Sequence, residues 1–355
     1  MVSMPDLARA MREAAEGLFI LRLGHELGEG YSSIVVPLLR SIRAVHDALS
    51  TERLGSGVYI CMALDVGGSP EGGQGIAVDS AAQLMEQHDS SKPFTVLIEP
   101  SGFRMRVWRA APQAASIDRF LVYRYLGAYR ESFVAAGVEI GVPVVSGFPS
   151  FFSMPYFLEL RDALLHHGRH CIRYSQCEIF ARSWRDESRL VHLPKPEWLM
   201  RRSMQTHLRC SLRDHSDVTI MPEQNVDEAK RVDIKVTWMN SNRVGLIEIK
   251  WLGASAAVGA DSFSQRYSAA RAREGARQLI GYMDRYRAEA PHEEARGFLV
   301  VYDARRARLR PDSTSLSRDD ALAYKHSEID YYGLLGNRDD IDDPIRLFSF
   351  PVSAG

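Results

Sequence analysis

Cysteine is scarce in this sequence, and its few copies are scattered. The 355 residues include four cysteines, at positions 61, 171, 177 and 210, and no two of them form a Cys-x-x-Cys pair. Zinc and iron–sulfur sites usually need such closely spaced ligands. The spacing therefore argues against a cysteine-ligated metal, and we interpret the four side chains as free thiols in a reducing compartment.

Long apolar runs and a strong net charge are also missing. No stretch approaches 18 uninterrupted apolar residues, so we expect a cytoplasmic protein with no membrane partner. The net charge of -1 creates no overall field that would attract nucleic acid, and a basic surface would have to be local. With 45% hydrophobic and 25% charged residues, the composition is that of an ordinary globular protein.

The length favours two domains. At 355 residues the chain exceeds the usual single domain of about 100–200 residues. The sequence "LPKP", Leu193–Pro196, interrupts the pattern of regular elements, and the Glu after Pro196 suits the first turn of a helix. We therefore predict an N-terminal α/β domain over residues 1–193 and a second domain over residues 194–355.

The first 193 residues have the pattern of a mixed α/β domain without a catalytic signature. The Gly-rich stretch Gly67–Gly75 lacks the Gly-Lys-Ser/Thr ending of a phosphate-binding loop, so we interpret it as a flexible loop. Substrate recognition, signal sensing and assembly through a homo-oligomer or protein partner all stay open for this part. Periodicity predicts helices over Leu7–Phe19, Ser33–Leu49 and Ser116–Ala136, and strands over Val58–Val66, Phe94–Glu99, Phe103–Arg109 and Ile172–Trp184.

The second half has a clearer order of elements. A helix, three strands, a long helix and a strand follow one another, which gives the order αβββαβ. The final apolar run, Ile345–Val352, is suited to an edge strand because it contains Pro351. The predicted segments before that run are Glu197–Leu212, Val218–Glu223, Val232–Trp238, Val244–Trp251, a helix containing Gln278, and Gly297–Asp303.

Charged residues stand inside the second and third of these strands. With a turn at Asn240-Ser241, paired positions have numbers that sum to about 481, so Asp233 lies opposite Glu248 within one residue of register. Lys250 shares the face of Glu248, because side chains alternate along a strand. Two opposed carboxylates destabilise a sheet unless a cation lies between them.

A divalent cation removes this conflict. Mg²⁺ commonly takes one or two protein carboxylates and completes its shell with water and phosphate oxygens. Lys250 would then lie where an ammonium group can orient or deprotonate the attacking water and stabilise charge at phosphorus. The residues Asp233, Glu248 and Lys250 therefore predict metal-assisted phosphodiester hydrolysis with Mg²⁺ or Mn²⁺.

This pattern resembles the PD-(D/E)xK nuclease superfamily. Asp233 is followed after fourteen residues by Glu248-Ile249-Lys250, and "QLIGY", Gln278–Tyr282, matches the Gln-x-x-x-Tyr element of the RecB-like branch. The resemblance covers Glu197–Asp303 and implies a restriction-endonuclease-like αβββαβ core with a mixed sheet. It also implies Asp233, Glu248 and the Ile249 carbonyl as metal ligands, Gln278 and Tyr282 as supporting catalytic residues, and DNA rather than RNA as substrate.

Several alternatives stay open at this point. The pair Asp233-Ile234-Lys235 is a second Asp-x-Lys match, which would need Asp217 or Glu223 upstream. Either Glu197 or Glu223 could be a further metal ligand, and Glu197 could equally serve only the helix dipole. Histidines 192, 207 and 215 lack ligand-like spacing, so we interpret them as core or surface residues. The basic residues that could follow a nucleic-acid backbone are Arg201, Arg202, Arg209, Arg273 and Arg277.

Two functional hypotheses follow. The first is a metal-dependent nuclease of the kind found in restriction or phage defence, with a DNA partner. The second is a non-catalytic regulatory or interaction protein that keeps a nuclease-like fold, in which the hairpin charges only pair with one another. Metal-dependent cleavage distinguishes them.

Overall fold

The computed structural model forms two compact units, residues 1–155 and 156–355. Each unit is described by itself. The structure describes residues 17–28, 31–49, 54, 57–63, 70, 74–89, 91–99, 105–113, 117–127, 130–144, 150–153, 156–212, 218–225, 231–239, 241, 243–291, 293–336 and 338–352. The predicted loop Gly67–Gly75 and the first ten residues of the predicted helix Leu7–Phe19 lie largely outside these ranges.

The first unit contains a seven-stranded mixed sheet with the order β2-β4-β3-β1-β5-β6-β7. Strands β1 and β3 are parallel, and the other neighbours are antiparallel. The predicted strands starting at Val58, Phe94 and Phe103 are confirmed within the described residues. The strands are β1 (Val58–Ala63), β2 (Ile76–Val78), β3 (Phe94–Ile98), β4 (Met105–Trp108), β5 (Phe120–Tyr125), β6 (Glu131–Ala135) and β7 (Val138–Gly141).

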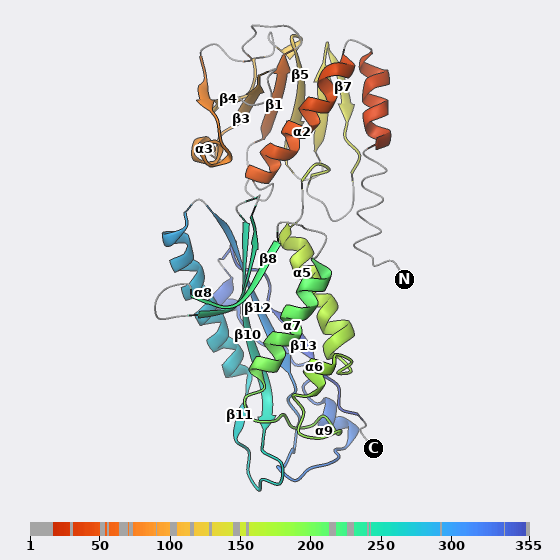
Figure 1. Ribbon diagram of the computed structural model, residues 1–355, viewed down its shortest axis with the longest axis vertical. Helices are drawn as coiled ribbons and strands as arrows, with labels where there is room; N and C mark the ends of the chain where they lie inside the picture. Colours follow the sequence, from red (N-terminus) through yellow and green to blue (C-terminus); the bar gives the residue numbers. More distant parts are fainter. Residues whose placement is uncertain are drawn as a thin grey trace. The chain divides into compact units, whose positions relative to one another are not determined.

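Helix α2 (Ser32–Ala48) covers one face of this sheet (Figure 1). Its apolar positions Val35, Leu38, Ile42 and Val45 recur at helical spacing and are buried at 3% exposure or less. They share a core with inward residues of the strands. The predicted helix Ser33–Leu49 is therefore confirmed, while the short α3 (Ala81–Gln87) was not predicted.

The predicted helix Ser116–Ala136 is wrong. Its residues form β5 and β6, which pair antiparallel with Val122 opposite Val134. Aromatic and β-branched side chains favour strands. Gly127, at φ +112, lies in the connection between β5 and β6 and has a backbone conformation that no helix accepts. The apolar residues of this stretch recur at a spacing that also fits a helix. Because neighbouring strands are available to form backbone hydrogen bonds with it, the segment folds as strands.

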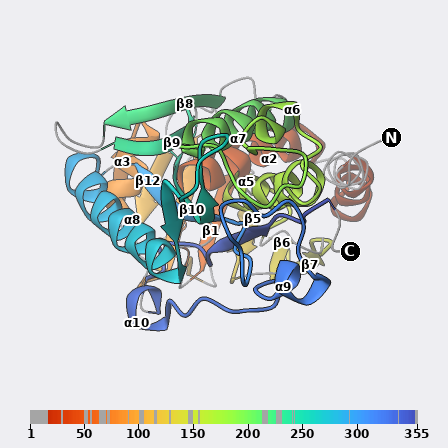
Figure 2. The same ribbon diagram turned by 90° about the horizontal axis from the view of Figure 1, so that it is seen from below.

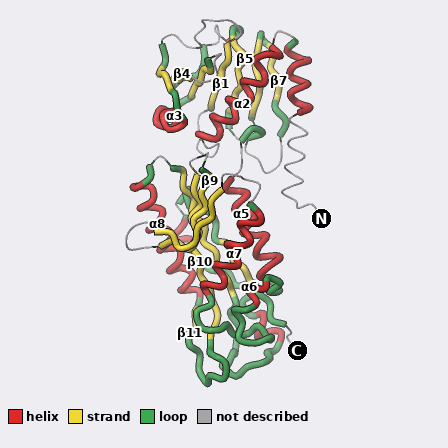
Figure 3. The backbone as a smooth tube through the Cα atoms, in the orientation of Figure 1, coloured by secondary structure: helices red, strands yellow, loops and turns green. Residues whose placement is uncertain are grey.

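The second unit is built on a mixed sheet with the order β13-β12-β10-β9-β8, and β11 pairs with the far end of β10. Long loops surround β11 (Figure 3). The predicted order αβββαβ is present in α7, β8, β9, β10, α8 and β12, and the predicted edge strand is β13. The strands are β8 (Val218–Asn225), β9 (Arg231–Trp238), β10 (Arg243–Ser255), β11 (Gln265–Tyr267), β12 (Glu294–Asp303) and β13 (Ile345–Phe348).

Helices cover both faces of this sheet. Figure 2 shows α8 on one side of β10 and β12, and α5 and α7 on the other. Leu246 and Leu252 of β10 pack with α8, whereas a side chain at Gly245 would meet Leu160 of α5. Even-numbered residues of β10 therefore face α8. The helices are α5 (Tyr156–His167), α6 (Glu178–Ala181), α7 (Glu197–Ser211), α8 (Ala269–Glu289), α9 (Arg318–Leu322) and α10 (Tyr332–Leu335).

The second unit begins at Tyr156, and the predicted boundary at residues 193/194 therefore cuts through it. Helix α5 contributes buried Phe157, Leu160 and Leu164 to this unit. The predicted strand Ile172–Trp184 is also wrong, because a π-helical turn (Gly168–Ile172) and α6 occupy this stretch. Its alternating apolar residues pack against helices and β13 instead of pairing with a strand.

Two simpler expectations concern the cysteines and the membrane. All four cysteines are unpaired in the structure. Among the residues described, no helix combines the length and apolar character needed to span a bilayer.

Candidate active site

The predicted hairpin forms with the predicted register. Trp238 pairs with Arg243 and Ile234 with Ile247, so paired numbers sum to 481. The ladder ends at that second pair. The Asp233 carboxylate then accepts a hydrogen bond from the backbone N–H of Ile249 at 2.8 Å, which brings it beside the strand that carries Glu248. Ser241 lies in the turn, and Asn240 lies outside the described residues.

Glu248 and Lys250 form a buried ion pair on β10. Their residues are 3% and 6% exposed, and the Lys250 Nζ lies 2.5 Å from Glu248 Oε1. Both face α8, where the chain has glycine at position 275. A Cβ at that position would lie 2.5 Å from Lys250 Cγ and 3.1 Å from Leu299 Cδ1. Gly275 thus provides the space that the lysine side chain fills.

The surroundings of Glu248 disfavour its charge. Burial is the largest cause, and the nearby carboxylate of Asp233 adds to it, so the pKa of Glu248 rises from 4.5 to about 8. The Lys250 ammonium opposes this shift, and Glu197 contributes to it. Three carboxylates, those of Glu197, Asp233 and Glu248, therefore influence one another at this end of the hairpin, and additional positive charge there would stabilise all three.

Arg201 of α7 provides part of that positive charge. Its Nη1 lies 3.0 Å from Asp233 Oδ1, and its Nη2 lies 2.5 Å from Glu223 Oε1. Both oxygens of Asp233 are thus engaged, one by the guanidinium and one by the Ile249 N–H. Arg201 is consequently an internal partner of the site in this structure, and its predicted contact with nucleic acid would require it to leave Asp233.

Glu197 and Glu223 occupy different positions relative to Glu248. Glu197, in the first turn of α7, lies 3.4 Å from Arg271 of α8, so the starts of the two helices meet beside the hairpin. Glu223 is half exposed and forms an ion pair with Arg201. Because Glu197 affects the pKa of Glu248, it is the better placed of the two for a role at this site.

The supporting residues on α8 differ in burial. Tyr282 is 6% exposed and belongs to the core that α8 forms with β10 and β12. Gln278 is half-buried, and because it lies three residues after Gly275, helical spacing puts it on the same side of α8 as that glycine. A supporting role of Gln278 beside Lys250 stays a prediction, and Tyr282 lies farther along the helix.

The remaining predicted basic residues lie on the outer sides of α7 and α8. Arg202 and Arg277 are exposed, and Arg273 is half-buried. Arg209 donates to the Ile220 carbonyl at 3.3 Å. Within the described part of the chain these four arginines, unlike Arg201, form no ion pair with a carboxylate, which leaves them available to bind a phosphate.

The donor set suits a hard cation, although it is small. Across the described ranges, no three His, Cys, Asp or Glu side chains gather as they would around a metal ion. Asp233 and Glu248 supply carboxylate oxygens, and Ile249, the residue after Glu248, has a backbone carbonyl. Mg²⁺ and Mn²⁺ accept such oxygen ligands and retain water for the other positions.

Comparisons with known proteins add no assignment. No protein-family model matches the chain, and neither a curated protein nor a solved structure does.

Sequence reasoning missed Gly275. A glycine inside a helix is unfavourable by about 1 kcal/mol relative to alanine, so its presence within "REGARQ" was a signal of close packing. The signal does not say which side chain approaches. Only the packing of α8 on β10 identifies that side chain as Lys250.

Histidine 192 confirms the expectation of a core histidine and provides a test of pH dependence. It is 1% exposed and stacks on Trp184 with ring centroids 3.8 Å apart. Burial lowers its pKa from 6.5 to about 3. His207 shares this behaviour, with a pKa of about 4, and His215 lies outside the described residues.

Replacing His192 with glutamine is expected to change the pH dependence of stability. The unfolded chain binds a proton at His192 below pH 6.5, and the folded chain does so only near pH 3, so His192 lowers stability as the pH falls through this window. The free energy of unfolding of His192→Gln relative to the natural chain should therefore rise by about 1.4 kcal/mol per pH unit below 6.5.

Denaturant unfolding at pH 7.5, 6.5, 5.5 and 4.5 measures this difference. The comparison must be between the two chains, because Glu131 and Glu248 have raised pKa values and change stability in the opposite direction. A constant difference across these pH values would show that His192 is protonated equally in both states.

Proposed function

We propose that this chain is a divalent-metal-dependent nuclease that hydrolyses phosphodiester bonds, with DNA as the preferred substrate. The observation that carries the proposal is the buried Glu248–Lys250 pair beside Asp233, where the β9–β10 ladder ends. A buried ion pair is seldom a gain in stability over apolar residues of similar volume. Its presence beside a second carboxylate therefore favours a chemical role.

Each residue of the candidate site has a separate role in this proposal. Asp233, Glu248 and the Ile249 carbonyl would hold Mg²⁺ or Mn²⁺, which when bound supplies Lewis-acid stabilisation of a phosphate oxygen. Lys250 orients the attacking water and stabilises negative charge at phosphorus, and its near-burial strengthens that effect. Gln278 supports Lys250 from α8. Tyr282, which is buried in the core beneath that helix, would support the site from one turn farther along α8.

Substrate and biological context are drawn from the resemblance to PD-(D/E)xK nucleases. That resemblance favours DNA over RNA and a role in restriction or phage defence in the cytoplasm. Arg202, Arg209, Arg273 and Arg277 would contact the backbone of the substrate. The first unit, residues 1–155, would recognise substrate, sense a signal or bind a partner such as a second copy of the chain.

A specific observation also favours the non-catalytic alternative. Within the described chain, Arg201 and Lys250 already neutralise Asp233 and Glu248. A regulatory or interaction protein could keep this charge network for the stability of the hairpin alone. The two functions differ in whether a divalent cation enters the network.

The deciding experiment measures cleavage of supercoiled plasmid, linear duplex, single-stranded DNA and RNA, each with Mg²⁺, with Mn²⁺ and with EDTA. The nuclease proposal expects cleavage of a DNA substrate that requires the metal. The interaction alternative expects no cleavage of any substrate, together with unfolding midpoints that Mg²⁺ and Mn²⁺ leave unchanged.

Gly275→Ala should lower cleavage by about 10- to 100-fold, although alanine favours a helix by about 1 kcal/mol. The added methyl group would overlap Lys250 Cγ, so the ammonium group must move away from the reacting atoms. Cleavage rates and thermal midpoints together measure the two effects.

Gly281→Ala is the matched control on the same helix. Its Cβ would meet only the Arg285 Nη2, at 3.3 Å, and that flexible side chain can move. Gly281→Ala should therefore stabilise the protein and retain full cleavage. Equal cleavage by both variants would contradict the assigned position of Lys250.

A further inference from the structure

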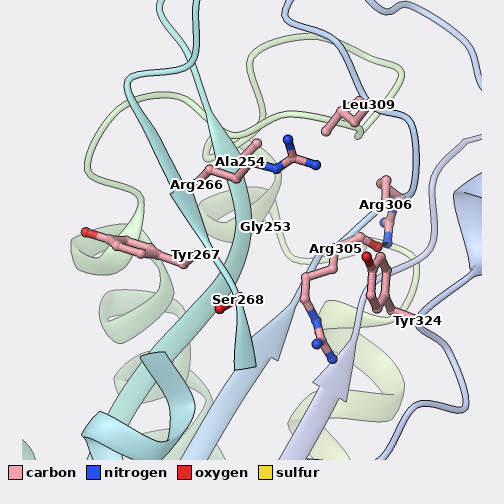
Figure 4. Close-up of a pocket in the computed structure, with 9 residues that line it drawn as sticks. All are labelled: Gly253, Ala254, Arg266, Tyr267, Ser268, Arg305, Arg306, Leu309 and Tyr324. Atoms are coloured by element: carbon pink, nitrogen blue, oxygen red, sulfur yellow. Dashed lines mark hydrogen bonds between the residues drawn. The ribbon is translucent and has the colours of Figure 1, made fainter. Parts of the chain in front are cut away.

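A second charged site lies beyond the carboxylates, at the far end of β10. A cavity of about 200 Å³ opens there between the β10–β11 pair and the segment after β12. Figure 4 shows the Arg266 side chain reaching from β11 toward Arg306, while Tyr267 points away. Gly253 lies five residues after Glu248, about 17 Å along the strand, so this cavity is separate from the candidate active site.

Arginine side chains outnumber carboxylate groups around this cavity. Asp303 is fully buried and pairs with Arg305 and Arg346 at 2.7 Å each. Arg306 is 3% exposed and forms no ion pair within 4 Å in the described part of the chain. The guanidinium groups of Arg305, Arg306 and Arg346 thus lie near one carboxylate, which leaves a largely buried excess of two positive charges, and the exposed Arg266 of the cavity wall adds a third. Burying unpaired charge is costly, and an anion would offset that cost.

Arg306 itself has unused hydrogen-bonding capacity. Its Nη1 and Nη2 donate to the carbonyls of Arg305 and Ser349, at 2.9 and 2.6 Å. Its Nε is buried and has no hydrogen-bond partner within the described ranges. Buried donors are almost always paired, so an orphan N–H on a residue that lines a cavity indicates a missing acceptor.

Helix α8 begins at the same cavity. Ser268, its N-cap, lines the wall, and the 21-residue helix has no acidic residue in its first turn. The N-terminus of a helix presents unpaired N–H groups and a partial positive charge of about +0.5, which favours an anion. Arg266 also lines the cavity; its side chain is exposed and forms no ion pair with the other described residues.

From these contacts we infer that the cavity binds a phosphate monoester. A terminal phosphate carries about -1.5 to -2 charges near neutral pH, which matches the excess of two, whereas a phosphodiester carries one. The cavity is smaller than the roughly 300 Å³ of a typical small-molecule pocket, so it accommodates the phosphate group with the rest of the ligand outside. That this phosphate ends a nucleic-acid strand rests on the proposed nuclease function.

The test measures binding in EDTA, where cleavage cannot interfere. The probes are fluorescent single-stranded oligonucleotides of one sequence that carry a 5′-phosphate, a 3′-phosphate or no terminal phosphate, read by anisotropy at fixed ionic strength. One phosphorylated probe should bind at least about tenfold more tightly than the unphosphorylated probe, as expected for charged hydrogen bonds. Inorganic phosphate should compete for the cavity and so reduce the difference in affinity between the phosphorylated and unphosphorylated probes.

Two variants assign the effect to the cavity. Arg266→Ala removes the exposed guanidinium, and Arg306→Lys keeps a positive charge but loses the Nε–H. Both should abolish most of the preference for the phosphorylated probe. Arg266→Ala should keep the thermal midpoint, whereas Arg306→Lys should lower it, because the shorter donor set loses at least one of the hydrogen bonds to the carbonyls of Arg305 and Ser349. Arg182→Ala removes an exposed arginine that does not line the cavity, and it should keep the preference.

Competition experiments distinguish a free nucleotide from the end of a nucleic-acid strand. If a nucleoside monophosphate competes as well as the phosphorylated oligonucleotide, the source is a free nucleotide; if only the oligonucleotide competes, the source is a strand end. Equal binding of all probes, or a preference that survives in both Arg266→Ala and Arg306→Lys, overturns the inference. Loss of the preference in these variants, with no metal-dependent cleavage by the natural chain, would retain the phosphate site and reject the nuclease.

Discussion

Lys250→Met and Glu248→Gln are each expected to reduce metal-dependent cleavage by more than about 100-fold. Both changes keep the size of the side chain. Lys250→Met removes the ammonium group 2.5 Å from Glu248, and Glu248→Gln removes the charge that a cation would bind. Neither change should unfold the protein, because burial already favours the protonated form of Glu248.

Stability separates a catalytic role from a structural one. Removing one partner of a buried ion pair is destabilising, whereas replacing both partners can be neutral or stabilising. The double variant Glu248→Gln/Lys250→Met should therefore match or exceed the natural chain in its free energy of unfolding, and it should still lack cleavage. Denaturant unfolding and a cleavage assay on the same preparations give both results.

Lys235→Met is the control for this pair. Lys235 belongs to the alternative match Asp233-Ile234-Lys235, and its Nζ lies 4.7 Å from the centre of the Tyr286 ring, a position that fits a structural cation–π contact. We expect Lys235→Met to retain cleavage. The reverse result, with cleavage lost in Lys235→Met and kept in Lys250→Met, would transfer the catalytic role to the alternative motif.

A chain comprising residues 194–355 is expected not to fold, whereas one comprising residues 156–355 should unfold cooperatively. The shorter chain lacks α5, whose Tyr156 and Phe157 rings lie 5.5 and 5.8 Å from the ring of buried Trp238. It also lacks Leu160, which occupies the space above Gly245.

The magnitude follows from burial. Four large apolar side chains of α5 are buried: Tyr156, Phe157, Leu160 and Leu164. At about 1.5–3 kcal/mol each they contribute about 6–12 kcal/mol, comparable to the whole stability of a typical domain, about 5–15 kcal/mol. Near-ultraviolet circular dichroism, which reports the packing of Trp238, and denaturant unfolding measure the result. Similar cooperative unfolding of both chains would place the boundary at residue 194 after all.

Local patterns in the sequence predicted the hairpin because its causes are local. Turn-prone residues at Asn240-Ser241 and the period of two in the flanking strands leave one register that buries Ile234 and Ile247 together. The same reasoning predicted α7, α8 and the edge strand β13. Each of these elements is long or has a distinctive terminal residue, so neighbours in the sequence suffice to define it.

Residues far apart in the sequence decided the rest. Phe120–Tyr125 and Glu131–Ala135 form paired strands because β1 is available to pair with the first of them. Helix α5 belongs to the second unit because Leu160 packs against Gly245. The register that brings Asp233 beside the strand of Glu248 was predicted from the sequence alone. The contact of Gly275 with Lys250 and the excess of arginine around Asp303 were decided only by the tertiary structure, because packing and charge balance depend on which distant side chains share one small volume.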